Sequence, residues 1–185
     1  MKKIIIALVV AALGIGLYYT FFVEESPAKD NRITDEALGL SFEYLDGYAA
    51  LEVGAGTTTP EIIKTIVFMD EAEYQSIING EREGGEGPPS IIILGQNNPE
   101  NLSPETWAAA NPGLSSYELR TGETRSVTVD GREALQYEAD GLYANRNVIF
   151  TEDEKIYLVN GSFLDRDSEI YRDFDRFVES IRFIE

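Results

Sequence analysis

The side chains that could carry chemistry in this sequence are carboxylates, because histidine and cysteine are absent while aspartate and glutamate number 33. Without imidazole or thiol, the chain lacks the base of a serine triad, a thiol nucleophile and the usual ligands of zinc. Two carboxylates held about 5 to 9 Å apart in a cleft can hydrolyse a glycosidic bond. No spacing selects one pair among so many acids. A carboxylate-based, glycosidase-like hydrolase of the cell envelope is therefore an alternative function without assigned catalytic residues.

The segment LDRDSE at residues 164–169 offers Asp165, Asp167 and Glu169 as oxygen ligands for calcium. An EF-hand loop counted from Asp165 needs glycine at its sixth place and glutamate at its twelfth, where this chain has Ile170 and Arg176. The acids also precede an apolar helical stripe, and negative charge stabilises a helix N-terminus. We favour this helix-capping role, and a calcium-sensitive solute-binding or adhesion domain stays open as a third function.

Three further motifs suggest ligands at first sight. GAGTTTP at residues 54–60 lacks both the third glycine and the Gly-Lys-Ser/Thr of nucleotide-binding loops, so it is expected to be a flexible loop. Trp107, the sole tryptophan, adjoins a run of alanines and is expected to anchor a helix to the core. Asn101 and Asn160 match the glycosylation sequon. The sequence assigns no catalytic, cofactor-binding or metal-binding residue, and it implies no cofactor.

The first apolar run, IIIALVVAALGIGLYYTFFV at residues 4–23, would form about 30 Å of helix, which matches the hydrocarbon core of a bilayer. Lysines precede the run and glutamates follow it, which places the N-terminus in the cytoplasm. A cleaved signal is the alternative, but YYTFFVEES offers no small-x-small site. We predict a single-pass signal anchor at residues 1–23, a polar linker at 24–38 and an extracytoplasmic domain at 39–185, all at the cell membrane.

The exported part is strongly acidic. All 33 acids and 13 of the 15 basic residues follow residue 23, so its net charge is 13 minus 33, or −20. Nucleic acid and anionic lipid surfaces are therefore excluded as expected partners. Because the chain has no cysteine, the domain must be stable without disulfides.

Alternating apolar segments and turn signals indicate a sheet with helices. Asp-Gly pairs at residues 46–47, 130–131 and 140–141 predict three hairpins. IIKTIVFM and SIIILG are further strands, and the apolar SIIIL is expected in the middle of the sheet with both faces covered. Helices are expected after Asp70, after Ser103 and over the final stripe, for which the apolar residues are Ile170, Phe174, Phe177 and Ile181. The expected fold class is α+β, with six to eight antiparallel strands covered by helices.

The order of these pieces resembles the PsbP-like domain, an α/β/α sandwich. The resemblance covers residues 39–185 and depends on GLSFEYLDGYAALEV, SPETWAAA, VTVDGREALQYEA, KIYLVNGSF and FDRFVESIRFIE. It implies a binding or assembly subunit, since that fold has no common catalytic residues. Any histidine contact of photosynthetic members cannot be carried over, because this chain has no histidine.

The anchor, the acidic body and the missing catalytic groups favour one function. The chain is expected to be a membrane-tethered extracytoplasmic binding or scaffolding domain, without catalysis, that contacts the membrane through its N-terminal helix and an envelope protein through its body.

Overall fold

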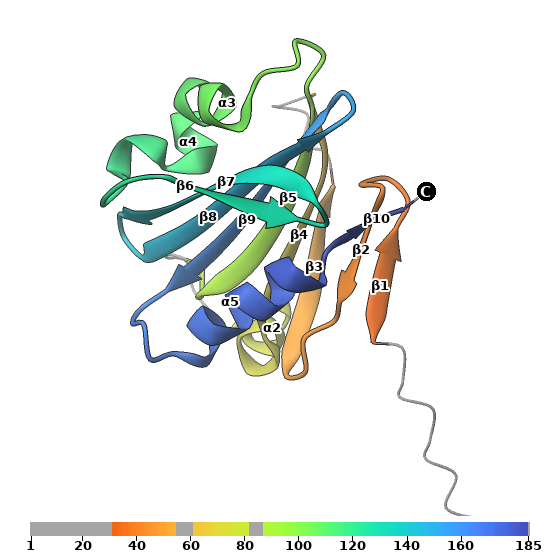
Figure 1. The fold of residues 1–185 in the computed structure, drawn as a ribbon. Coiled ribbons are helices and arrows are strands. Elements are labelled where there is room, and N and C mark those ends of the chain that lie inside the picture. Colours follow the sequence, from red (N-terminus) through yellow and green to blue (C-terminus); the bar gives the residue numbers. More distant parts are fainter. Residues whose placement is uncertain (1–30, 55–60, 82–86, 185) are drawn as a thin grey trace, which may run out of the picture. The chain divides into compact units, whose positions relative to one another are not determined.

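A seven-stranded antiparallel sheet is the largest element of the computed structural model, which describes residues 31–54, 61–81 and 87–184 (Figure 1). Strands β6 to β9 follow one another as a meander, and β9 then pairs with β5. This arrangement confirms the predicted antiparallel sheet and the interior position of the SIIIL segment. In spatial order the strands are β3 (Tyr48–Gly54), β4 (Ile62–Asp70), β5 (Ser90–Asn97), β9 (Lys155–Phe163), β8 (Ala144–Glu152), β7 (Arg132–Asp140) and β6 (Arg125–Val129).

One face of this sheet is covered by helix α5 (Glu169–Ser180) and by a second sheet of three short strands. The second sheet has the order β1 (Arg32–Asp35), β2 (Leu40–Glu43) and β10 (Arg182–Phe183). Figure 1 shows α5 lying across the strands with the small sheet beside it. Phe174 and Phe177 are fully buried there, as the apolar stripe predicts. The backbone approaches Phe174 so closely at Gly161 that an added Cβ would lie 2.4 Å from the phenyl ring.

The opposite face is covered over part of its length by α3 (Pro104–Ala110), α4 (Pro112–Ser115) and the 3₁₀ turn η1 (Tyr117–Leu119). Ser103 caps α3 by accepting a hydrogen bond from the Thr106 N–H, as predicted. Trp107 is buried in the cluster beneath α3, which confirms its role as a core anchor. The main sheet therefore carries helices on both faces, in agreement with an α+β fold.

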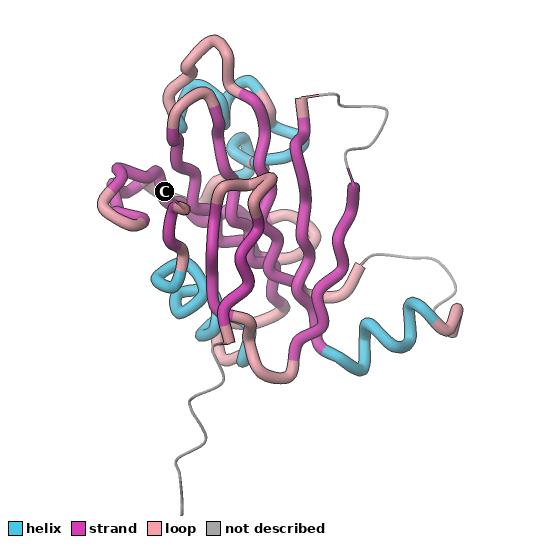
Figure 2. The backbone as a smooth tube through the Cα atoms, turned by 90° about the vertical axis from the view of Figure 1, so that its right-hand side faces the viewer, coloured by secondary structure: helices cyan, strands magenta, loops and turns pink. Residues whose placement is uncertain are grey.

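Helix α2 (Glu71–Ile78) follows β4 and has no buried residue. Its start is the predicted one, since Asp70 accepts hydrogen bonds from the N–H groups of Ala72 and Glu73. Gly80, just past the end of α2, has the left-handed conformation that favours glycine, with φ of 68°. Figure 2 shows α2 projecting away from the strands.

Two hairpins form where the sequence predicts them, but the first does not. Asp130 and Gly131 make the two-residue turn between β6 and β7, and Asp140 begins the turn between β7 and β8. The prediction at Asp46–Gly47 is wrong, because β2 pairs with β1 and β10 whereas β3 pairs with β4. The Asp-Gly pair reverses the chain at that point, but long-range pairing sends its two strands into different sheets.

The N-terminal boundary of the domain also differs from the prediction. Strand β1 lies inside residues 24–38, the segment whose composition predicts a linker, and residues 32–185 form one compact unit. Its polar residues make specific contacts: Asp35, only 7% exposed, pairs with Lys64 at 2.6 Å and accepts the Leu38 N–H at 2.9 Å. A polar composition therefore does not mark a linker here.

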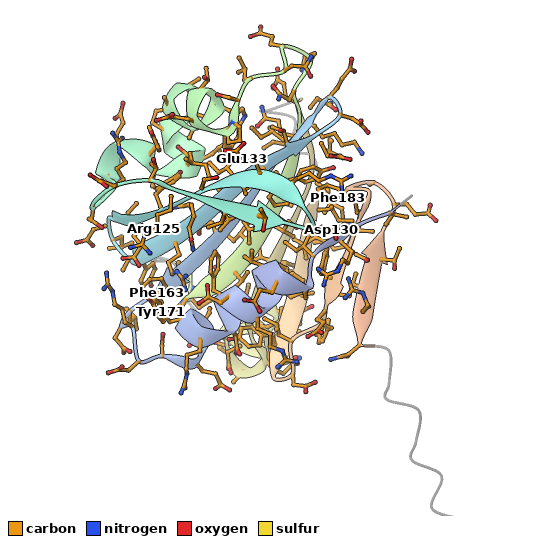
Figure 3. All side chains as sticks on the ribbon, in the orientation of Figure 1. Arg125, Asp130, Glu133, Phe163, Tyr171 and Phe183 are labelled. Atoms are coloured by element: carbon orange, nitrogen blue, oxygen red, sulfur yellow. The ribbon has the colours of Figure 1, made fainter. Side chains whose placement is uncertain are left out.

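The last residues form a strand as well. Beyond α5, Arg182 and Phe183 pair with β2, which brings the described residues to ten strands. Asp130 Oδ2 accepts the Phe183 N–H at 2.9 Å and so joins the β6–β7 turn to β10, as the two labelled residues show in Figure 3.

The predicted anchor, residues 1–23, lies outside the described residues. Within the described ranges, no helix has the length and apolar character needed to cross a membrane.

Candidate functional site

Three exposed leucines gather at one end of the main sheet. Leu119 ends η1, Leu142 lies in the β7–β8 turn and Leu164 begins the β9–α5 connection; their exposed fractions are 52%, 65% and 74%. Leu164 lines a cavity of about 390 Å³ together with Thr121, Asp140 and Ala144, while Leu119 lies beside Gly141. We call these three residues the leucine rim. Clustered exposed apolar side chains mark interaction surfaces more often than isolated ones do.

The turns beneath the rim hold these leucines outward. In the β7–β8 turn, Asp140 pairs with Ala144, and the Tyr143 carbonyl accepts hydrogen bonds from the Gly141 N–H and the Asn145 side chain. In the β9–α5 connection, the Asp165 carboxylate accepts the Asp167 N–H at 2.9 Å and its carbonyl accepts the Ser168 hydroxyl. Leu142 and Leu164 therefore sit on locally bonded backbone, which lowers the entropy lost when a partner binds.

A second cavity, of about 400 Å³, lies on the other side of Leu164 and is acidic. Among the residues that the structure describes, its lining includes four carboxylates and no basic side chain; the carboxylates belong to Asp46, Asp70, Glu73 and Glu169. Its wall includes Tyr48, whose hydroxyl donates to Asp173 at 3.0 Å. Burial raises the pKa of Tyr48, and the nearby Asp173 carboxylate raises it further. The surface beside the rim thus favours a positively charged group.

The calcium candidates do not converge. Asp165 bonds within its own turn and lines the cavity of about 390 Å³ beside Leu164, which we call the rim cavity. Glu169 instead lines the acidic cavity. Across residues 31–54, 61–81 and 87–184, no group of three acids is arranged to hold a metal ion. The capping role is also only partly correct, because the residue at the start of α5 is Ser168, which makes no side-chain capping bond.

The carboxyl groups whose pKa is clearly displaced do not resemble a general acid, which needs a raised value. Burial by itself would raise the pKa of Asp35, but hydrogen bonds from Lys64 and the Leu38 N–H outweigh it and hold the pKa below its usual value. The hydrogen bond from Arg132 likewise lowers the pKa of Glu152. Both groups are held as carboxylates in ion pairs.

The remaining motifs are placed as follows. Asn160 lies inside β9 and donates to Asn147 at 2.8 Å, so this sequon is part of the sheet rather than a surface loop. Asn101 is exposed in a turn. The connection between β5 and α3 is closed by two hydrogen bonds between Asn98 and Leu102. Most of GAGTTTP and residues 82–86 lie outside the described residues.

Sequence reasoning missed the leucine rim. A signal was present, since a leucine at the tip of a hairpin and another before a polar turn occupy positions that usually carry polar residues. What the sequence could not show was that η1, the β7–β8 turn and the β9–α5 connection meet at the same end of the sheet.

Two solved structures have folds similar to that of this chain. No family profile and no curated protein sequence matches the chain. The solution structure of cyanobacterial PsbP (CyanoP) from Synechocystis sp. PCC 6803 is similar, with a TM-score of 0.53, 15% identity, and coverage of 85% of this chain and 95% of that one. A crystal structure from Bacteroides thetaiotaomicron VPI-5482 matches with a TM-score of 0.50 and 7% identity over 85% of this chain. The match spans about half of that second protein, 49% of its length. The chain has a PsbP-like fold.

Proposed function

We propose that this chain is a membrane-tethered, extracytoplasmic binding domain that docks an envelope protein at the leucine rim and performs no catalysis. The convergence of three exposed leucines at one end of the sheet carries the proposal. The PsbP-like fold is compatible with a non-catalytic scaffold. Tethering rests on the apolar run at residues 4–23, and the extracytoplasmic side rests on the lysines before it.

The chemistry around the rim argues for a protein partner. The leucines favour apolar side chains, and the neighbouring acidic cavity favours a lysine or arginine placed beside them. An anionic membrane surface would also contact leucines. However, residues 32–185 carry 12 basic and 30 acidic residues, or −18, which repels such a surface.

Co-purification tests the proposal. The full-length chain is recovered from detergent-solubilised envelope as wild type and as the Leu142→Asp/Leu164→Asp variant. Both leucines are exposed, so the variant should fold normally. The amount of partner recovered with it should fall at least about tenfold, because charges in an apolar contact are costly.

Ile184→Asp is the matched control. Ile184 is also exposed, but its N–H bonds to the Gly39 carbonyl near Lys155, at the end of β9 opposite Leu164. This variant should keep the partner. Recovery of the same partner by the rim variant, or repeated recovery of the wild type alone, would contradict the proposal.

The hydrolase alternative keeps no specific support in the described part of the chain. Its distinguishing measurement is release of reducing sugar from cell-wall or surface polysaccharide, with the Glu169→Gln variant as comparison, since Glu169 lines the acidic cavity.

A further inference from the structure

A third cavity, of about 220 Å³, gathers three arginines of this acidic protein: Arg125, Arg146 and Arg166. It shares Thr121, Glu138 and Arg166 with the rim cavity, so the two adjoin. Residues 32–185 contain only 12 basic residues. Three of them at one small cavity is a concentration that the composition does not suggest.

Strand register explains how two of these arginines face the same way. Arg125 of β6 stands opposite Gln136 of β7, and Arg146 of β8 stands opposite Glu138 of β7. Directly opposed residues share a face of the sheet, and positions 136 and 138 share it because side chains alternate. This is the α5 face, since Arg146 packs over Tyr171 and Phe174 of α5.

Arg146 is held rigidly. Its guanidinium donates to both carboxylate oxygens of Asp175, at 3.0 and 2.6 Å, and lies 4.9 and 5.1 Å from the ring centres of Tyr171 and Phe174. The side chain is only 11% exposed. Arg146 lines the cavity from this fixed position, so a ligand that it contacts would cost little further loss of conformational freedom.

The other two arginines are less constrained. Arg166 enters from the β9–α5 connection, pairs with Glu138 and is mostly exposed. Arg125 is exposed on β6, the edge strand of the sheet, and within the described ranges its side chain forms no ion pair or hydrogen bond. Its guanidinium therefore keeps all of its N–H groups for a ligand, whereas Arg146 and Arg166 already donate to carboxylates.

We propose that this arginine cavity binds a small oxyanion, a phosphoryl or carboxyl group, with Arg125 as the principal ligand and Arg146 and Arg166 as supporting donors. The ligand would bridge guanidinium groups through its oxygens, the contact that arginine makes with carboxylates and phosphates. Gln136 and Thr121 add a neutral amide and hydroxyl at the same wall.

The net charge of the cavity alone does not predict that it binds an oxyanion. Glu123 and Glu138 also line the cavity and Asp175 holds Arg146, so carboxylates balance the three cations. Donors are in excess, however, because each guanidinium carries more N–H groups than one carboxylate uses, while a carboxylate offers only acceptors. The volume also limits the ligand, since drug-sized molecules need cavities of roughly 300 Å³ or more.

An NMR titration tests the site. The Nε–Hε signals of arginine are followed in the detergent-solubilised full-length chain during addition of sodium phosphate, sodium acetate or sodium chloride at constant ionic strength. Phosphate, acetate or both should shift the Arg125 signal saturably, and chloride should not. Saturation by phosphate alone identifies a phosphoryl ligand, and saturation by acetate alone identifies a carboxyl ligand.

Two variants complete the test. With the remaining arginine signals as readout, Arg125→Ala should weaken oxyanion binding about tenfold or more, because it removes charged hydrogen bonds. Arg172→Ala removes an exposed arginine of α5 that does not line the cavity, and it should bind as wild type. Equal binding by Arg125→Ala and wild type, or shifts that grow linearly with all three salts, overturns the proposal. The Leu142→Asp/Leu164→Asp variant should keep this response, which separates the site from the leucine rim.

Discussion

Helices α5 and α2 each follow a strand of the main sheet, and the one with the better cap is the less buried. Asp70 gives α2 two capping hydrogen bonds, whereas α5 has no side-chain cap. Yet α5 buries Ile170, Phe174 and Phe177, while α2 buries nothing. A cap decides where a helix begins. The apolar stripe decides whether the helix holds the fold together.

This difference predicts that α5 and α2 open with different free energies. The α5 face should open only when the whole domain unfolds, because its aromatic side chains contact both sheets. Helix α2 should open alone, since its stability depends on local bonds and short helices are marginal in water. Three measurements can break or sharpen the comparison.

The largest effect is expected from Phe174→Ala. Removing the buried ring leaves a cavity beneath α5 beside Gly161, and the free energy of unfolding should fall by about 3 to 5 kcal/mol. Urea denaturation measures the loss. Ile78→Ala on α2 is the control and should change stability by less than about 0.5 kcal/mol, because Ile78 is exposed. Similar losses in the two variants would remove the distinction between the helices.

An intermediate effect is expected from Asp35→Asn, where the small sheet meets the α5 face. Replacing the buried carboxylate weakens the pair with Lys64 and should cost about 1 to 3 kcal/mol at pH 7. Because the pKa of Asp35 is lowered by folding, its contribution is present above the unfolded value of about 4 and is lost as the pH falls through the folded pKa.

The variant should therefore show a shallower loss of stability in acid than wild type. Glu152→Gln is the comparison, since the pKa of Glu152 is also lowered, through Arg132, but its pair is more exposed. The Glu152→Gln substitution should have a smaller effect on the loss of stability at acid pH, which we call the acid limb. An unchanged acid limb in Asp35→Asn would show that the pair does not couple protonation to folding.

The smallest effect on the whole domain is expected from Asp70→Ala. Loss of the cap should destabilise α2 by about 0.5 to 2 kcal/mol. Hydrogen exchange should quicken at the amides of residues 75–78, while the urea midpoint stays within error of wild type. A clear fall in the midpoint would mean that α2 supports the fold after all.

The sequence predicted the local features of the fold well. The turn at Asp130–Gly131, the cap at Ser103 and the stripe through Phe174 each depend on neighbouring residues, so their patterns can be read directly. The turn at Asp46–Gly47 shows the limit. Its residue types indicate a reversal of the chain, but they carry no information on which distant strand each arm will join.

The candidate sites were less predictable than the fold. Each leucine of the rim comes from a different connection, and each arginine of the cavity comes from a different element. Spacing along the chain does not bring such residues together.

By itself the sequence determined the acidic charge, the absence of histidine and cysteine chemistry, and the alternation that makes an antiparallel sheet with an amphipathic final helix. Only the tertiary structure decided that residues 32–35 and 182–183 join β2 in a second sheet, and that leucines and arginines cluster at one end of the first. The physical reason is the separation along the sequence of the residues that interact. Turns, caps and periodicity are set by neighbours a few residues apart. Strand pairing and surface clustering depend instead on which distant segments bury the most apolar area together.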